Sequence, residues 1–371
     1  MRSRLRFQSL FVQSPKNLFG LFFVSSVPFL RQSDNNRLSN EQKQLQKQIA
    51  EKIKQILKVY KDEKDQKLML AATLSCRFRE MDRVKINKSV LNDPFSEAII
   101  HTLREAASDN PKIIFSRSNV QGQAFYLPFD IERFRPMLMD EIVVEWIEKH
   151  SATQSNLHIV ELGAGLDFRE ERIILNNIKK IDKQWTETTK DAITNMCKTI
   201  CVHAVDVAAV MILRESFQPL VHSICEQHPL WKCSYNLRTT HIGHDLLDPQ
   251  TLELLMNNIM LLDQQSNRIQ DHRSEHDFSH VLFVAEALFC HLNCDKAKDF
   301  VEKLAERFPG ASLITDDNRL LKQDLKHVQV VKMLLIYDDK RVQRHLSLWF
   351  KLLFANIFRK LYRVYLMQFT S

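Results

Sequence analysis

The chain has 371 residues, of which 44% are hydrophobic and 26% charged, a composition that excludes a disordered or fibrous protein and suits one large or two ordinary globular domains. Only 6 glycines occur, which argues against glycine-rich and β-propeller architectures. The formal net charge is +7, but residues 1–33 and 340–371 contain basic residues and no acid, so the stretch between them is mildly acidic. We therefore expect no nucleic-acid groove across the body of the protein.

The cysteine content and the apolar stretches indicate the cellular compartment of the protein and whether it spans a membrane. Seven cysteines, an odd number, are spread through a chain with no convincing secretory leader, which favours reduced thiols and a cytoplasmic location. The apolar stretch 18–30 has 13 residues and contains Pro28, so it is shorter than the roughly 20 residues that span a bilayer. No transmembrane segment is expected.

The first 68 residues differ in composition from the rest. Residues 1–33 form a basic, acid-free extension that is rich in Ser and Phe, which resembles a mitochondrial or plastid transit peptide; a loosely docked extension is the alternative. Residues 34–68 are predicted to form a polar amphipathic helix that begins with a capping box of Ser39 and Gln42. We expect residues 1–68 to address or tether the protein and to contribute little to the core.

Residues 69–155 are predicted to form a helical cap, with helices over 70–81, 94–107 and 133–150. In residues 156–330 short apolar runs alternate with helical stretches. Strands are predicted at 157–162, 200–205, 236–242, 281–285 and 311–315, and helices at 169–181, 210–226, 249–262 and 295–308. This alternation is typical of a parallel sheet covered by helices on both faces, an α/β fold.

Residues 331–371 are expected to close the sheet and end the domain. The β-branched run 327–337 predicts one or two closing strands. The basic, aromatic stretch 346–367 is predicted to pack against the sheet as a terminal lid, with a membrane-surface helix as the alternative.

The most informative segment couples a strand to a glycine turn. The apolar run 157–162 leads directly into Gly163-Ala-Gly165, and glycines at the carboxyl end of a first strand let the backbone approach a nucleotide or nucleoside closely. The segment lacks the third glycine of the dinucleotide fingerprint and the Lys-Ser/Thr pair of a phosphate loop. A nucleoside without phosphates therefore fits better, and S-adenosylmethionine is the common one; a tight turn without a ligand is the alternative.

An acid follows the second predicted strand. Asp206 lies 41 residues after Gly165, and a carboxylate in this place can accept hydrogen bonds from both ribose hydroxyls. The usual separation is about 20 residues, so we infer a polar insertion around residues 179–190. Because Asp206 also precedes a helical run, a helix N-cap is the alternative.

Several blocks resemble the leucine carboxyl methyltransferase family, which includes the tetracenomycin-type polyketide O-methyltransferases. The run Glu161-Leu-Gly-Ala-Gly-Leu-Asp-Phe-Arg169 resembles the family's Gly-Ala-Gly-Leu-Asp-Thr-Arg signature. The segments 73–80 and 91–94 resemble its N-terminal helix and Asp-Pro turn, and Arg135 with Asp140 resembles its Arg-Thr-x-x-x-Asp element. The segment 282–292 is similar to its Ala-Glu-Gly-Leu-Phe-Met-Tyr-Leu strand. The resemblance covers residues 69–371, a methyltransferase domain.

The resemblance implies a fold, a cofactor and a set of cofactor contacts. The fold is the class I (Rossmann-like) methyltransferase fold, a seven-stranded, mostly parallel sheet with a helical N-terminal cap, and the cofactor is S-adenosyl-L-methionine. The implied cofactor-binding residues are Arg135 for the methionine carboxylate, Gly163 and Gly165 beneath the cofactor, Asp206 for the ribose, Asp245 and Leu246 beside the adenine, and Glu286 near the methionine moiety. The chain departs from the family pattern at Phe168, Ala287, His291 and Pro136.

The implied activity is transfer of a methyl group to a carboxyl or hydroxyl oxygen of a small molecule or a protein C-terminus. A carboxylate acceptor needs no general base, whereas a hydroxyl acceptor needs His291 or a nearby acid to take its proton. The alternative is a catalytically decayed methyltransferase-fold protein that binds or scaffolds, because Phe168 beside the glycine turn could crowd the cofactor.

Two groups of potential metal ligands are not expected to bind a metal. His272, His276 and His280 recur every four residues, but in polar sequence that is typical of a loop. Cys201 and His203 lie in the predicted buried strand 200–205, and Cys197 lies shortly before it, so satisfied core cysteines are the simpler interpretation.

Overall fold

The structure is a computed structural model, and it describes residues 38–60, 62–85, 91, 93–107, 134–151, 156–182, 200–228, 231, 237–265, 277–345 and 363–370. All of them belong to one compact unit, Arg37–Ser371. Within these residues no helix is long and apolar enough to cross a membrane. The predictions for residues 1–33 and for an insertion around 179–190 lie wholly or largely outside the described residues.

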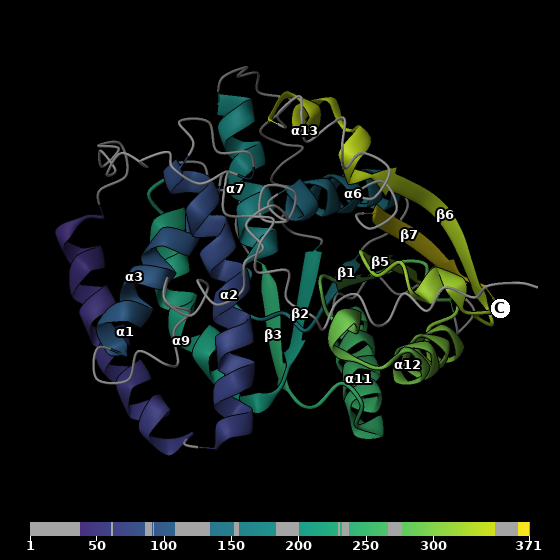
Figure 1. The fold of residues 1–371 in the computed structure, drawn as a ribbon, viewed down its shortest axis with the longest axis horizontal. Coiled ribbons are helices and arrows are strands. Elements are labelled where there is room, and N and C mark those ends of the chain that lie inside the picture. Colours follow the sequence, from purple (N-terminus) through teal and green to yellow (C-terminus); the bar gives the residue numbers. More distant parts are fainter. Residues whose placement is uncertain are drawn as a thin grey trace, which may run out of the picture. The chain divides into compact units, whose positions relative to one another are not determined.

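The unit is built on one seven-stranded sheet (Figure 1). Its strands are β1 (Leu157–Leu162), β2 (Ile200–Asp206), β3 (Arg238–Gly243), β4 (Val281–Ala285), β5 (Ser312–Thr315), β6 (Val328–Leu335) and β7 (Arg363–Phe369). Their order is β3-β2-β1-β4-β5-β7-β6. Strands β1 to β5 pair in parallel, and β7 runs antiparallel to both β5 and β6. The prediction of a seven-stranded, mostly parallel class I sheet is confirmed.

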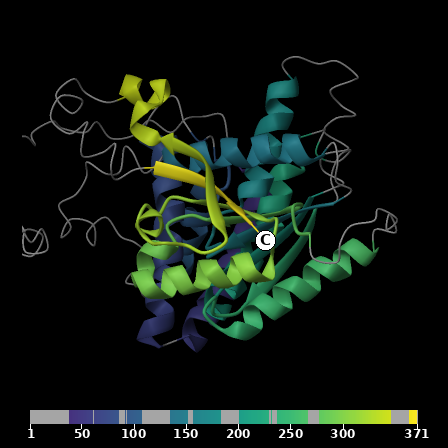
Figure 2. The same cartoon turned by 90° about the vertical axis from the view of Figure 1, so that its right-hand side faces the viewer.

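Helices cover both faces of this sheet, which lies edge-on between them in Figure 2. The helices are α1 (Asn40–Val59), α2 (Glu63–Lys85), α3 (Ser96–Ala106), α6 (Phe134–Ser151), α7 (Arg169–Asp182), α9 (Ala208–Cys225), α11 (Pro249–Gln265), α12 (Cys294–Arg307) and α13 (Lys340–His345). One core cluster joins α6 to one face of the sheet, and another joins α11 and α12 to the opposite face.

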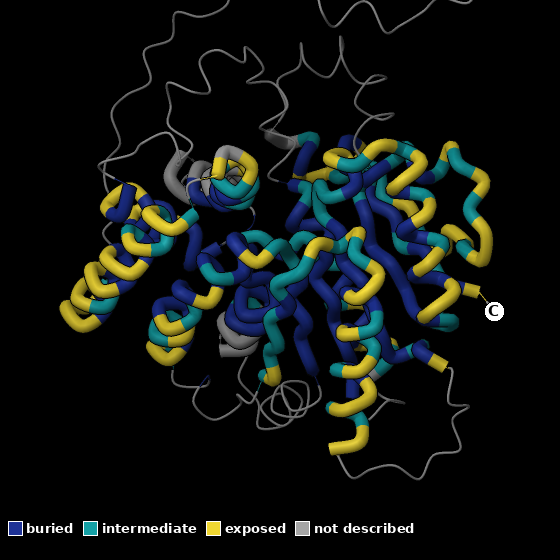
Figure 3. Tube along the Cα trace, turned by 90° about the horizontal axis from the view of Figure 1, so that it is seen from below, coloured by how far each residue is buried: buried dark blue, intermediate teal, exposed yellow. Residues whose placement is uncertain are grey.

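Successive side chains of β1 point to opposite faces of the sheet, which shows how the sequence produces these two layers. Leu157 and Ile159 pack with α6, whereas Val160 and Leu162 pack with α11 and α12. All six residues of β1 are buried, as expected for a central parallel strand covered on both faces. Figure 3 shows the buried strands between helices whose outer sides are exposed.

The C-terminal segment differs from its prediction. Residues 363–369 form β7, which lies between β5 and β6, so both the terminal lid and the membrane-surface helix are wrong for these residues. Tyr365 and Met367 are completely buried. A strand between two neighbours is apolar on both faces, and such a short run cannot be told from a buried helix by periodicity alone. Residues 346–362 lie outside the described residues.

The first helix also belongs to the core, contrary to the expectation for residues 34–68. The predicted capping box is present, because Ser39 and Gln42 exchange side-chain to backbone hydrogen bonds of 3.0 and 3.2 Å. Ile49 and Ile53 are buried in a cluster with α3 and α9. The expected boundary between residues 68 and 69 falls inside α2, so the compact unit begins before that boundary.

The burial of α1 gives a testable prediction. Ile53→Ala should lower the free energy of unfolding by about 2–4 kcal/mol, because it removes buried methyl groups and leaves a cavity. Val59→Ala, at a position of the same helix that is 77% exposed, is the matched control and should change it by less than about 0.5 kcal/mol. Urea unfolding followed by circular dichroism measures both. Equal stabilities of the two variants would show that α1 lies loosely on the surface.

Candidate functional site

The glycine turn lies at the carboxyl end of β1, where the connections from the central strands leave on opposite sides. Strand β1 pairs with β2 on one side and with β4 on the other, and ligands of open α/β sheets bind at such a switch point. Gly163 and Gly165 have φ angles of +66° and +54°, which L-residues with a side chain rarely adopt. The sequence therefore needs glycine at both positions for the backbone of the turn itself.

All three amides of the turn are already used within the protein. Gly163 and Ala164 donate to the carbonyl oxygen of Val205 at 2.8 and 3.1 Å, and Gly165 donates to Asp206 Oδ2 at 2.9 Å. The turn is therefore fastened to the end of β2. A phosphate-binding loop instead presents its amides to the ligand, so this turn is not built to hold a phosphate.

Asp206 has a structural task in addition to its predicted one. Its Oδ1 atom accepts a bond of 2.7 Å from the amide of Val207, while Oδ2 accepts from Gly165. The N-cap position of α9 is Val207, so Asp206 is not the helix cap that the sequence left open. A carboxylate has about four acceptor positions, and the two backbone bonds leave acceptor capacity on both oxygens. Burial raises the pKa of Asp206, although the two backbone bonds oppose that rise.

Arg135 and Glu286 are brought together, as expected for parts of one site. Arg135 donates from Nε and Nη2 to Glu286 Oε1, both at 3.2 Å, and its Nη1 lies 3.2 Å from Asp316 Oδ2. The side chains of Arg135 and Glu286 are 13% and 11% exposed. The guanidinium group therefore lies between two carboxylates at the carboxyl ends of β4 and β5, close to the surface.

A buried network of charges lies behind this pair. Arg169 donates to Asp140 at 2.7 Å and also to Glu286, and Arg172 forms two bonds of 3.0 Å to the two oxygens of Asp140. Both arginines also bind the carboxylate of Asp167. The family-like Asp-Phe-Arg run and the predicted Arg135–Asp140 element thus meet in one network, which connects the start of α7 to α6 and to the end of β4.

Two more buried arginines hold the ends of the glycine turn. Arg79 on α2 bonds Asp93 at 2.9 Å and the carbonyl oxygen of Leu166 at 3.0 Å. Arg214 on α9 bonds Glu161 at 2.8 Å and the carbonyl oxygen of Ala164 at 3.3 Å. The position of the turn thus depends on two helices, α2 and α9, as well as on the sheet.

The buried charges shift the pKa values of the acids in opposite directions. Burial alone would raise the pKa of Asp167, but Arg172, Arg79 and Arg169 hold it well below its ordinary value. Burial raises the pKa of Glu161 to about 7, against the effect of Arg214. Burial and the neighbouring Glu161 raise the pKa of Glu170 well above its ordinary value. The arginines therefore favour the ionised form of Asp167, whereas burial favours the neutral form of Glu170.

The two residues predicted beside the adenine lie after β3, at the same edge of the sheet. Asp245 is exposed, and its Oδ1 accepts a bond of 3.0 Å from the amide of Leu247. Leu246 is half-buried and packs at the margin of the core cluster with α11 and α12. Neither residue contacts the Arg135–Glu286 pair by any hydrogen bond or ion pair found among the described residues, so their part in a common site stays a prediction.

Phe168, the most conspicuous departure from the family pattern, packs in the core. It is 1% exposed and belongs to the cluster of α1, α3 and α9. Its ring lies 4.5 Å from the guanidinium carbon of Arg214 and makes an edge contact with Phe95. Cation–π contacts of this kind orient the arginine. Phe168 thus supports the residue that holds the glycine turn.

The other departures have different consequences. Pro136 is buried in the first turn of α6, a position that tolerates proline. His291 is exposed in the short 3-10 helix Phe289–His291. Ala287 has a φ angle of +51°, which glycine adopts freely and alanine does not. The backbone there still needs the glycine that the family pattern has.

Sequence reasoning missed two neighbours of this site. Asp316 follows β5 and faces Arg135, and the rule that identified Asp206, an acid directly after a parallel strand, could have found it. Leu288 packs against the glycine turn, since a Cβ added to Gly163 would lie 2.9 Å from its Cδ1. Nothing in the sequence indicates that second contact, because it joins segments 125 residues apart.

Comparisons with known proteins show only distant similarity to this chain. No protein-family model and no curated protein matches the sequence. A protein from Listeria monocytogenes assigned to the class I S-adenosylmethionine-dependent methyltransferases has 12% identity and a TM-score of 0.35, over 90% of this chain and 89% of that one. Magnesium protoporphyrin IX methyltransferase from Synechocystis PCC 6803, with bound S-adenosylmethionine, has 10% identity and a TM-score of 0.33, over 74% and 97%. The fold assignment therefore depends on the strand order of this chain.

Removal of an arginine from the buried network should be costly. Arg172→Met should lower the free energy of unfolding by about 3–5 kcal/mol, because it leaves the buried carboxylates of Asp140 and Asp167 with one partner fewer. Arg341→Met removes an exposed arginine that bonds Glu141 and Asp339, and should change it by about 1 kcal/mol at most. Chemical unfolding compares them, and similar losses in both variants would contradict the importance of the buried network.

The strained backbone at Ala287 predicts a substitution that stabilises the protein. Ala287→Gly should raise the free energy of unfolding by about 1 kcal/mol, because glycine removes the steric cost of the positive φ angle. Ala285→Gly, two residues earlier in buried β4, is the control and should lower it by about 1 kcal/mol. Thermal unfolding of the wild-type chain and the two variants measures whether each substitution raises or lowers the stability. A loss of stability in Ala287→Gly would show that this backbone is not strained.

Proposed function

We propose that the chain is an S-adenosylmethionine-dependent O-methyltransferase of the leucine carboxyl methyltransferase type. The observation that carries the proposal is the Arg135–Glu286 pair beside the glycine turn. The two side chains have the charges that bind the carboxylate and ammonium groups of a methionine moiety. In the structure they bind each other at 3.2 Å, and a zwitterionic ligand can replace this bond with one bond to each partner.

The remaining groups of the edge fit the nucleoside part of the same cofactor. The turn has no amide left for a phosphate, and S-adenosylmethionine contains none. Asp206 keeps acceptor capacity on both carboxylate oxygens, which suits two ribose hydroxyls. We propose the exposed Asp245 and the neighbouring Leu246 for the adenine. The side chain of Leu288 over Gly163 would then form the apolar floor of the site.

The chemistry required of the protein is mainly alignment. When bound, the cofactor supplies a methyl group on a positively charged sulfur, and that charge is lost as the methyl group passes to the acceptor oxygen. Such a reaction depends on orientation and on the exclusion of water. The rigid, buried network behind Glu286 fixes one end of the site. A carboxylate acceptor needs no base, and a small molecule or a protein C-terminus can supply it.

Titration with S-adenosylhomocysteine tests the cofactor. Calorimetry should show one binding site in the wild-type chain, and Asp206→Ala should weaken binding roughly ten- to hundredfold, the effect of losing hydrogen bonds to a charged group. Asp277→Ala, which removes an acid that bonds only a nearby loop amide among the described contacts, Ser279 at 2.9 Å, is the matched control. Unchanged affinity in folded Asp206→Ala would leave Asp206 with its structural task alone.

A second measurement separates the enzyme from a decayed, binding-only protein. The protein is incubated with tritiated S-adenosylmethionine and cell extract fractionated by size. Carboxyl methyl esters release volatile tritiated methanol in alkali, whereas methyl ethers of hydroxyl groups do not. Alkali-labile label is expected, and alkali-stable label would exclude a carboxyl acceptor. Binding without transfer in any fraction would favour the decayed protein, and absence of binding would contradict the proposed cofactor.

A further inference from the structure

A second cluster of chemically active side chains lies at the amino ends of the central strands, opposite the glycine turn at their carboxyl ends. His158 is the second residue of β1, His280 immediately precedes β4, and Asp263 lies in the last turn of α11. Gly163 lies five residue steps along the extended chain from His158, which is about 16 Å. This cluster is therefore separate from the glycine turn, and it depends in no way on the proposed function.

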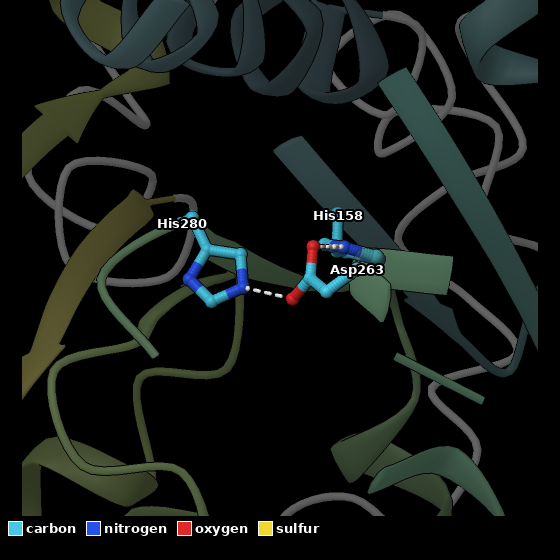
Figure 4. A group of neighbouring side chains, drawn as sticks. All are labelled: His158, Asp263 and His280. Atoms are coloured by element: carbon cyan, nitrogen blue, oxygen red, sulfur yellow. Dashed lines mark hydrogen bonds and ion pairs between the residues drawn. The ribbon is translucent and has the colours of Figure 1, made fainter. Parts of the chain in front are cut away.

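The three side chains converge on one point (Figure 4). Asp263 Oδ1 lies 3.1 Å from His158 Nε2, and Asp263 Oδ2 lies 2.9 Å from His280 Nε2. The candidate ligand atoms of the three residues all lie within 4.8 Å of one another. Around a tetrahedral zinc ion with bonds of about 2.0–2.1 Å, ligand atoms are about 3.3 Å apart. Small side-chain rotations would bring these atoms to that separation.

The surroundings of His158 resemble those of a metal ligand. Its other ring nitrogen, Nδ1, lies 3.0 Å from His203 Nε2, and His203 Nδ1 lies 2.7 Å from the hydroxyl oxygen of Thr240. Metal-bound histidines almost always donate their second N–H to such a partner. Here His158 Nδ1–H can donate to His203, His203 Nδ1–H to Thr240, and the Thr240 hydroxyl to the carbonyl oxygen of Val202 at 3.4 Å.

The two histidines of the cluster are buried, and its aspartate is partly exposed. The side chains of His158 and His280 are 0% and 6% exposed, whereas that of Asp263 is 32% exposed. An ion can therefore enter beside Asp263 and complete its coordination with water. Two imidazole nitrogens and one carboxylate oxygen form a donor set that suits zinc.

We propose that His158, Asp263 and His280 form a binding site for one zinc ion. The three residues come from the start of β1, the end of α11 and the residue before β4. The ion would join these segments at the amino edge of the sheet, so its role would be to stabilise the fold. The periodic His272 and His276 of the sequence lie outside the described residues.

The test begins with the full chain after treatment with a chelator. Titration with Zn²⁺ should show one tight site per chain and raise the melting temperature, since an ion that binds only the folded state stabilises it. His280→Ala and Asp263→Ala should each weaken this binding at least a hundredfold. Cys290→Ser and Cys294→Ser, which remove an exposed and a half-exposed thiol of the described chain, are the matched controls and should leave zinc binding unchanged.

Absorption spectroscopy of the wild-type protein keeps the test decisive if a variant fails to fold. X-ray absorption of the zinc-loaded chain should show only nitrogen and oxygen neighbours, and Co²⁺ in place of zinc should give the visible bands of a tetrahedral site. Sulfur neighbours, binding that persists in His280→Ala and Asp263→Ala, or no binding to the wild-type chain would each overturn the proposal. The cluster would then be a hydrogen-bonded network alone.

Discussion

The candidate cofactor site depends on the ion pairs between Asp167 and the arginines around it. Its carboxylate is buried, binds Arg169 and Arg172, and lies 3.6 Å from a nitrogen of Arg79. A buried charge without partners is strongly destabilising, whereas a fully bonded network holds its members in one arrangement. Because these arginines come from α2 and α7, the helical cap cannot move relative to the glycine turn without breaking several buried ion pairs.

This network explains how a helical cap and a sheet form one functional edge. Arg169 extends from Asp140 on α6 to Glu286 after β4, and Glu286 in turn bonds Arg135. The proposed ligand groups at the surface are thus continuous with charges fixed in the interior. A ligand that exchanges with the Arg135–Glu286 bond would therefore meet a guanidinium and a carboxylate that are already oriented, which reduces the entropy cost of binding.

The two ends of the parallel strands carry different kinds of polar groups. At the carboxyl edge, charged groups near the surface surround a turn whose backbone is fixed by β2. At the amino edge, imidazoles of β1 and β2 form a buried chain that ends at the partly exposed Asp263. The pKa of His203 is lowered to about 3, mainly by burial, so the imidazole of His203 is neutral at physiological pH. We propose a zwitterionic nucleoside as the ligand of the carboxyl ends and a cation as the ligand of the amino ends.

The sequence by itself determined the parallel α/β core, the capping box of α1 and the glycine turn, because each depends on neighbouring residues: strand runs, Ser39 with Gln42, and Gly163 with Gly165. The resemblance to a known family implied Arg135 and Glu286 as cofactor contacts, and the place of Asp206 directly after a predicted strand also suggested that residue. Only the tertiary structure decided that β7 enters the sheet, that Phe168 supports Arg214, and that His280 meets His158 and Asp263. These outcomes are contacts between segments far apart in the chain, and periodicity reports which side of a segment is buried but not which partner buries it.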